Sequence, residues 1–240
     1  MTAPAAGAPR AFASKVLGIR DESRGVRTFR LAVPEDFSFI PGMWVMLHFE
    51  DDPKLWRAYS ISTSPSEKGF IEISLNNVGP FTQRMFALKG GEILMLKGPH
   101  GRWHWREDQR RAVLISGGTG LTPFRSMGRY AVERGFASRL TILHSARTPD
   151  DRLYLDDLER FSRAGMKVYE TITGQAAGWS GPRGRIDLAV IEREVPDLRE
   201  AVYYMCGPKA LIADLTSALV KRGVPQERIH HERWGDYSDL

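Results

Sequence analysis

The chain has 240 residues, of which 42% are hydrophobic and 26% charged, as in a globular protein of one large or two ordinary domains. Its net charge of +5 allows an acidic partner, but basic residues are spread along the chain and no nucleic-acid-binding motif is present. A single cysteine, Cys206, excludes an internal disulfide and a cysteine-ligated iron–sulfur cluster within these residues, and the histidines form no metal-binding set.

The N-terminal residues 1–11 are rich in Ala, Pro and Gly and lack the apolar core of a signal peptide. No apolar run in the sequence approaches the ~20 residues that a membrane-spanning helix needs. We therefore expect a cytoplasmic protein whose residues 1–11 form a disordered tail.

The first half of the chain, residues 13–97, predicts short antiparallel strands. Hydrophobic and polar residues alternate between Phe29 and Val33 and again between Val45 and Phe49, as on half-buried strands. Further strands are expected at residues 56–61, 69–75 and 93–96, with one helix at 82–88. Strands of this length and spacing are typical of a sandwich or a closed barrel, and closure is favoured because it removes exposed sheet edges.

Two segments of this half could bind an anion. The first is Arg57-Ala58-Tyr59-Ser60, which offers a guanidinium fork, an aromatic ring and a hydroxyl on one strand. The second is Gly79-Pro80-Phe81-Thr82, where a helix begins with unpaired N–H groups. The alternatives are an amphipathic strand with a surface arginine and an ordinary capped helix.

The second half alternates strands with helices. Strands are expected at residues 112–115, 140–143, 167–171 and 201–205, and helices at 123–134, 154–163 and 209–222. This order predicts a parallel sheet covered on both faces, whose ligands bind at the carboxyl ends of the strands. The charged segment 104–111 separates the two halves and is a natural domain boundary.

A glycine-rich turn, Gly117-Gly118-Thr119-Gly120-Leu121-Thr122-Pro123, joins the first of these strands to its helix. Such a turn can cradle a pyrophosphate, although it falls short of the dinucleotide fingerprint and no acidic residue ends the next strand. A turn that serves packing alone is the alternative. Ser145, Arg147 and Cys206-Gly207-Pro208 fall at the same sheet edge, which favours ligand binding.

Five motifs occur in order along the chain. They are Arg57-x-Tyr59-Ser60, Gly79-Pro80-Phe81-Thr82, Gly98-Pro99-His100-Gly101, Gly118-Thr119-Gly120-Leu121-Thr122-Pro123-Phe124 and Tyr204-Met205-Cys206-Gly207-Pro208. Together they resemble the ferredoxin–NADP reductase family over residues 13–234. The resemblance implies two domains: an antiparallel Greek-key β-barrel that binds FAD (residues 12–107) and an α/β domain with a parallel sheet that binds NAD(P) (residues 108–240).

The resemblance also implies a role for each matching residue. Arg57 would pair with the flavin phosphates, Tyr59 would pack on the isoalloxazine ring, and Ser60 would hydrogen-bond near flavin N5. The full flavin set is Arg57, Ala58, Tyr59, Ser60, Gly79, Pro80, Phe81, Thr82 and Trp234, with Thr82 and the N–H groups of Gly79 and Phe81 at the pyrophosphate.

The implied nucleotide set is Gly118, Thr119, Gly120, Ser145, Arg147, Cys206, Gly207 and Pro208. Cys206 would line the nicotinamide pocket, Trp234 would shield the flavin, and Glu232 could polarise or protonate there, so Ser60, Cys206 and Glu232 are the expected catalytic residues. The chain departs from the family in continuing to Leu240 and in having Trp where Tyr is typical.

Arg147 matches one arginine that NADPH-preferring members place against the 2′-phosphate. A second is replaced by Thr173-Gly174, although Arg183 or Arg185 could substitute, so the nucleotide is NADH or NADPH with a lean towards NADH.

The expected function is hydride transfer between NAD(P)H and flavin N5, followed by single-electron transfer to or from an external carrier. The carrier would be an acidic ferredoxin or flavodoxin, and the protein a monomer or weak oligomer. Arg102, Arg106, Arg110 and Arg111 could dock the carrier, although a solvated linker is the favoured interpretation of these arginines. The alternatives are an oxygenase reductase component, an NAD(P)H:flavin reductase, and a flavin electron-transfer subunit of a larger complex.

Overall fold

A computed structural model describes residues 5–106 and 111–233 of the chain. It divides into two compact units, each treated by itself below. Unit 1 comprises residues 1–105 together with 122–130, and unit 2 comprises residues 106–121 and 131–240.

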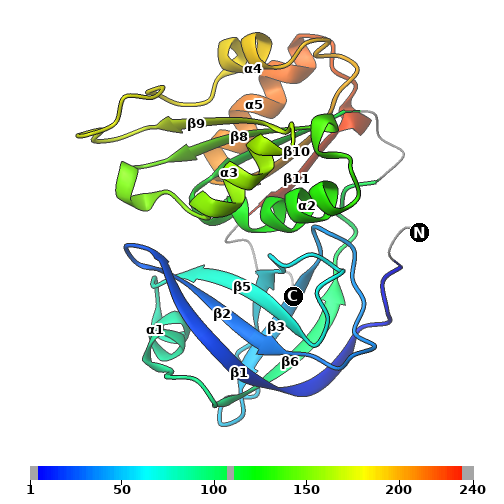
Figure 1. Cartoon of the computed structure of the whole chain (residues 1–240), viewed down its shortest axis with the longest axis vertical. Coiled ribbons are helices and arrows are strands. Elements are labelled where there is room, and N and C mark those ends of the chain that lie inside the picture. The colour runs from blue at the N-terminus through cyan, green and yellow to red at the C-terminus, as the bar shows by residue number, and fades with distance from the viewer. Residues whose placement is uncertain (1–4, 107–110, 234–240) are drawn as a thin grey trace. The chain divides into compact units, whose positions relative to one another are not determined.

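Unit 1 is built on a six-stranded antiparallel sheet in the order β4-β3-β6-β1-β2-β5 (Figure 1). An isolated bridge between Ile61 and Ile73 brings the two end strands together, so the sheet curls into a barrel as predicted. The elements are β1 (Arg10–Ser23), β2 (Val26–Ala32), β3 (Trp44–Phe49), β4 (Arg57–Ser60), β5 (Phe70–Asn76), α1 (Pro80–Ala87) and β6 (Ile93–His100).

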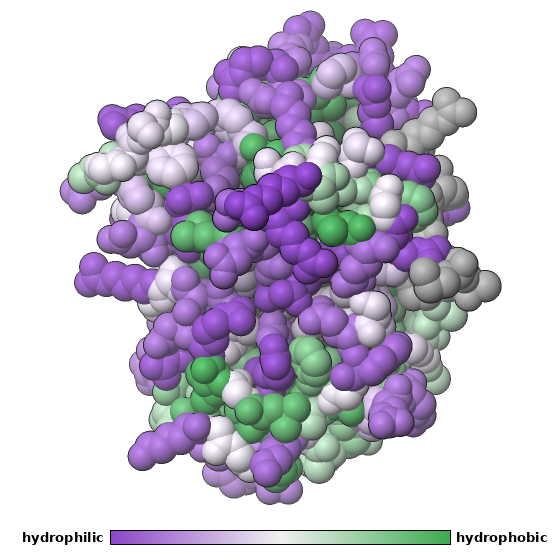
Figure 2. Space-filling view, viewed as in Figure 1, coloured by the Kyte–Doolittle hydropathy of each residue, from purple (hydrophilic) through white to green (hydrophobic). Residues whose placement is uncertain are grey.

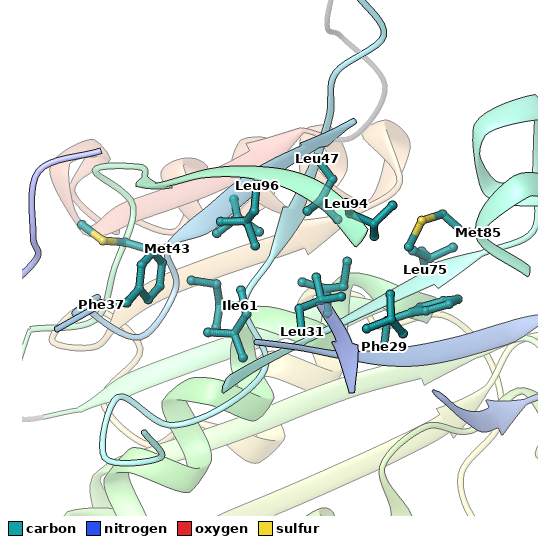
Figure 3. Packing of buried hydrophobic residues seen from close by; sticks show 14 of the residues in the cluster. Phe29, Leu31, Phe37, Met43, Leu47, Ile61, Leu75, Met85, Leu94 and Leu96 are labelled. Carbon is teal, nitrogen blue, oxygen red and sulfur yellow. The ribbon is translucent and has the colours of Figure 1, made fainter. Parts of the chain in front are cut away.

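The barrel core follows from the alternation seen in the sequence. Phe29 and Leu31 on β2 point inwards, and Leu47 on β3 and Leu94 and Leu96 on β6 meet them (Figure 3). All of these side chains are fully buried, and the burial of each one stabilises the fold by roughly 1.5–3 kcal/mol.

Several boundaries differ from the pattern-based prediction, and three of the differences have a clear structural reason. β1 begins at Arg10, inside the segment expected to be a tail, because Arg10 pairs with Gly98. β6 continues to His100 instead of ending at residue 96, because Gly98 pairs with Arg10 and His100 pairs with Trp44 of β3. α1 begins at Pro80, two residues early, since proline is well suited to the first helical turn.

Unit 2 contains a five-stranded parallel sheet in the order β11-β10-β7-β8-β9. Its strands are β7 (Ala112–Gly117), β8 (Leu140–Ala146), β9 (Lys167–Ile172), β10 (Val202–Gly207) and β11 (Ile229–Arg233). The helices of this half of the chain are α2 (Thr122–Glu133), α3 (Leu155–Arg163), α4 (Leu188–Glu194) and α5 (Lys209–Lys221), with 3₁₀ turns at Gly118–Leu121, Ala137–Arg139, Pro149–Asp151 and Gln226–Arg228.

Helices cover both faces of this sheet, as expected. α4 and α5 lie on one face and α3 lies on the other (Figure 1). Ile191 of α4 and Leu215 of α5 pack with Ile115, Leu143 and Met205 of the strands in one buried cluster. The periodicity did not predict α4 or β11, both of which are short and partly polar.

Among the described residues, no helix is both long and apolar enough to cross a membrane. The face shown in Figure 2 is mostly hydrophilic, and its hydrophobic areas are small and separate. Contacts made through this face would therefore depend mainly on polar and charged groups.

Candidate functional site

β4 carries the first predicted anion-binding segment and lies at the end of the unit 1 sheet. It pairs with β3 from Leu47↔Arg57 to Trp44↔Ser60, so its other edge lacks a strand along these residues. The Arg57 guanidinium is exposed, and it donates a hydrogen bond to the carbonyl of Trp56 at 2.9 Å. An open strand edge beside an exposed guanidinium fits a ligand with a polar planar ring and phosphates.

Tyr59, the aromatic residue of β4, packs against aromatic side chains of the barrel core. The ring of Tyr59 stacks on Phe81 at 6.2 Å with an interplanar angle of 27°, and Phe81 lies 5.2 Å from Phe49. Ala58 and Ser60 alternate with Tyr59 along the strand and are half-buried. Tyr59 is therefore held in a fixed orientation by α1 and β3.

The start of α1 is organised around the hydroxyl of Thr82. Its Oγ1 accepts hydrogen bonds from the N–H groups of Val78 and Gly79, both at 2.9 Å, and donates to the Gly79 carbonyl at 2.9 Å. Pro80 has no N–H to donate, and Phe81 and Thr82 provide the next two N–H groups of this helix start. The Thr82 hydroxyl shapes the turn, and its direct contact with a phosphate stays a prediction.

In unit 2, the glycine-rich turn that follows β7 packs against the end of the neighbouring strand, β10. A Cβ on Gly120 would lie 2.1 Å from the carbonyl oxygen of Cys206, so this glycine is required by backbone packing. Gly118 has φ +55, a left-handed conformation, and a Cβ there would meet nothing within 4 Å. The turn is thus pressed onto β10 at one glycine and open at another, which leaves space for a ligand beside its N–H groups.

The other predicted nucleotide-binding residues lie at the same edge of the sheet. Gly117 is the register partner of Ser145, whose Oγ donates to the Ser116 carbonyl at 3.3 Å. Gly207 ends β10, and Pro208 is the N-cap of α5. Arg147 is exposed and its carbonyl accepts the Gly174 N–H at 2.8 Å, while its guanidinium has no hydrogen-bond or ion-pair partner within the described part of the chain.

A row of polar side chains crosses this sheet near the carboxyl ends of its strands. Glu232 pairs with Cys206, Cys206 with Ser116, and Ser116 with His144. The Ser116 hydroxyl and His144 Nδ1 are 2.8 Å apart, and both residues are fully buried. The sequence analysis missed Ser116 and His144, although polar residues inside apolar parallel strands were the available signal.

Burial changes the protonation of both ends of this row. It raises the pKa of the Glu232 carboxyl to about 7, so this group gains or loses a proton close to neutral pH. It lowers the pKa of the His144 imidazole to about 4, so His144 is neutral there. Cys206 itself is buried, and Trp234, the expected flavin shield, lies outside the described residues.

Comparison with known proteins identifies both halves of the chain. Residues 14–105 match the family model of the oxidoreductase FAD-binding domain, and residues 114–217 match that of the oxidoreductase NAD-binding domain. Ferredoxin–NADP reductase B of Sorangium cellulosum is 30% identical over 93% of this chain and 97% of its own. The chain belongs to the ferredoxin–NADP reductase family.

Other similar proteins are named as reductases of oxygenases. The glycine betaine monooxygenase reductase subunit of Pseudomonas aeruginosa is 31% identical over 89% of this chain, which spans 62% of that relative. The solved ferredoxin reductase in carbazole 1,9a-dioxygenase has a TM-score of 0.83 and 26% identity, covering 95% of this chain and 70% of its own. The two matched domains of this chain are thus an FAD-binding and an NAD-binding domain of the oxidoreductase type.

Proposed function

We propose that this protein takes a hydride from NAD(P)H onto its FAD and passes the electrons one at a time to a separate carrier. FAD supplies the change from two-electron to one-electron chemistry, which no side chain can provide. The observation that carries the proposal is the pairing of Glu232 with Cys206 beside the glycine-rich turn, in a chain that also presents the open edge of β4.

The chain's own residues divide into three tasks. Arg57 pairs with the FAD phosphates, and Tyr59 and Ser60 bind the isoalloxazine ring. The turn from Gly118 to Gly120, with Ser145, Arg147 and the Cys206–Pro208 segment, holds the nicotinamide nucleotide. Glu232, neutral at pH values below about 7, is placed to hold or release a proton next to Cys206.

The proposed electron acceptor is a ferredoxin-type iron–sulfur protein. Because these 240 residues contain one cysteine, they cannot hold a cysteine-ligated iron–sulfur cluster, and the cluster must lie outside them. The net charge of +5 suits an acidic carrier. Of the arginines predicted to dock it, Arg102 and Arg106 are exposed, Arg111 pairs with Asp197 at 3.1 Å, and Arg110 lies outside the described residues.

Delivery of electrons to an oxygenase is the second candidate. Two of the relatives reported above are reductases named with an oxygenase, and both are longer than this chain. In this case the ferredoxin would be the intermediate carrier or part of the oxygenase assembly.

Anaerobic reduction of the FAD-loaded protein by NADH and by NADPH, followed by addition of ferredoxin, flavodoxin or free flavin, tests this function. We expect bleaching of the flavin bands, faster with NADH because one arginine of the NADPH pair is replaced, and reoxidation by ferredoxin. A protein that binds no flavin, or whose FAD neither nucleotide reduces, would refute the proposal.

The division of labour is tested by Arg57→Ala. Loss of a charge-assisted hydrogen bond to phosphate should raise the Kd of FAD about 10- to 100-fold. Isothermal titration should show the nucleotide Kd changed much less. Arg163→Ala is the control, because Arg163 is an exposed arginine whose ion pair with Glu159 stays on α3. A larger effect of Arg57→Ala on the nucleotide than on FAD would contradict the assignment.

A further inference from the structure

A buried arginine, Arg125, forms hydrogen bonds to the segment that follows β4. Arg125, in the first turn of α2, donates through Nη1 to Ser62 Oγ at 3.0 Å and to Glu72 Oε2 at 2.7 Å. The side chains of Arg125 and Glu72 are 2% and 4% exposed. Ser62 in turn donates to the Glu72 carbonyl, from its N–H at 2.8 Å and from its hydroxyl at 3.0 Å.

Two more residues of α2 hold the same segment. Ser126 Oγ donates to the Thr63 carbonyl at 2.5 Å, and Arg129 Nη1 reaches both carboxylate oxygens of Glu67 at 2.8 and 2.9 Å. Glu67 also accepts the N–H of Ser64 at 2.8 Å. Residues 62–67 are therefore fastened to α2 along their length, within unit 1.

The Glu72 carboxylate is the centre of this network. Its Oε1 accepts from Arg30 Nε and Nη2 at 3.1 and 2.8 Å, and Arg20 lies 4.0 Å from Oε2. Burial acts to raise the pKa of Glu72, but Arg125, Arg30 and Arg20 outweigh it and the pKa lies below its usual range. The carboxylate thus stays ionised and keeps Arg125 in one orientation.

This network adjoins the end of β4, where the chain pairs with β5. β4 has β3 on one side only, and the barrel closes on its other side through the Ile61–Ile73 bridge and the Ser62–Glu72 hydrogen bonds. Ser60, the last residue of β4, is two residues from Ser62. A displacement of Ser62 would therefore be transmitted to Ser60 through one intervening residue.

We propose that Arg125 is a positioning residue for the reaction, which fixes Ser62 against Glu72 and thereby sets the Ser60 hydroxyl at the flavin. This inference rests on the proposed function for its consequence in catalysis. A buried ion pair is often no more stabilising than apolar residues of equal volume, so the role argued for this pair is directional. The planar guanidinium provides that direction, because a single Nη1 serves two acceptors at fixed angles.

The double variant Arg125→Met with Glu72→Gln removes both buried charges, so neither is left unpaired. We expect the folded, FAD-loaded variant to show a shifted flavin absorption spectrum and an about tenfold slower reduction by NADH, the effect of one lost hydrogen bond of positioning. Arg125→Lys, which keeps the charge, should recover part of the rate. Arg163→Met, a surface control, should match the wild type.

Hydrogen exchange of the protein without FAD provides a readout that does not depend on activity. The backbone amides of residues 57–62 should exchange faster in the double variant, while those of β7 and β8 keep wild-type rates. An unchanged exchange rate at 57–62, or an unchanged spectrum and reduction rate in the folded double variant, would overturn the positioning role. If neither NADH nor NADPH reduces the FAD bound to the wild-type protein, the proposed function is refuted. The hydrogen-exchange result would still decide whether Arg125 positions residues 57–62.

Discussion

The buried imidazole of His144 makes a sharp prediction about stability and pH. Its pKa of about 4 in the folded protein, against 6.5 for the ordinary side chain, arises first from burial. Between these two values the unfolded chain binds a proton that the folded protein does not. Folding is therefore favoured above pH 6.5, and this contribution is lost as the pH falls towards 4.

The magnitude follows from the two pKa values. Linkage gives a loss of about 2 kcal/mol in the free energy of unfolding between about pH 7 and pH 5. Other groups titrate in this range, Glu232 with the opposite sign, because its raised pKa stabilises the fold at low pH. The difference between the wild type and His144→Phe, which cannot titrate, removes these shared terms.

Urea unfolding followed by circular dichroism at several pH values between about 5 and 8 is the assay. We expect His144→Phe to be less stable than the wild type at pH 8, since Ser116 loses its partner, and the gap to narrow by about 2 kcal/mol at pH 5. Thr171→Val, which removes a buried hydroxyl from the same sheet, should leave the wild-type slope unchanged. A gap between wild type and His144→Phe that is constant with pH would refute the reasoning.

Two further predictions concern the nucleotide-binding edge. In Gly120→Ala the new Cβ would meet the Cys206 carbonyl and displace the turn, which should lower the free energy of unfolding by about 1–3 kcal/mol. Calorimetry should show weaker NAD(P)H binding, while the FAD content stays at the wild-type level. Unaltered nucleotide affinity would contradict the packing argument. The rate of flavin reduction by NADH should fall as the pH rises through about 7, where Glu232 loses its proton, and stopped-flow profiles of Glu232→Gln should lack this step. The same step in both proteins would assign the titration to another group.

The sequence by itself determined the architecture of both halves. Side-chain alternation around Phe29 and Val45 predicted half-buried antiparallel strands, because the period of a strand is a local property. The order of strands and helices after residue 111 predicted a parallel sheet, and hence that Gly118 and Cys206 would meet at one edge. The resemblance to the ferredoxin–NADP reductase family rested on the same short motifs, which are also local.

Only the tertiary structure decided which distant residues act on one another. The register of β7, β8, β10 and β11 aligns Ser116, His144, Cys206 and Glu232, and no local pattern specifies that register. Arg125 and Glu72 are 53 residues apart in sequence and form a buried pair only because α2 packs within unit 1. The arginines around Glu72 keep its carboxylate ionised against the cost of desolvation, and this balance depends on residues that are distant in the sequence.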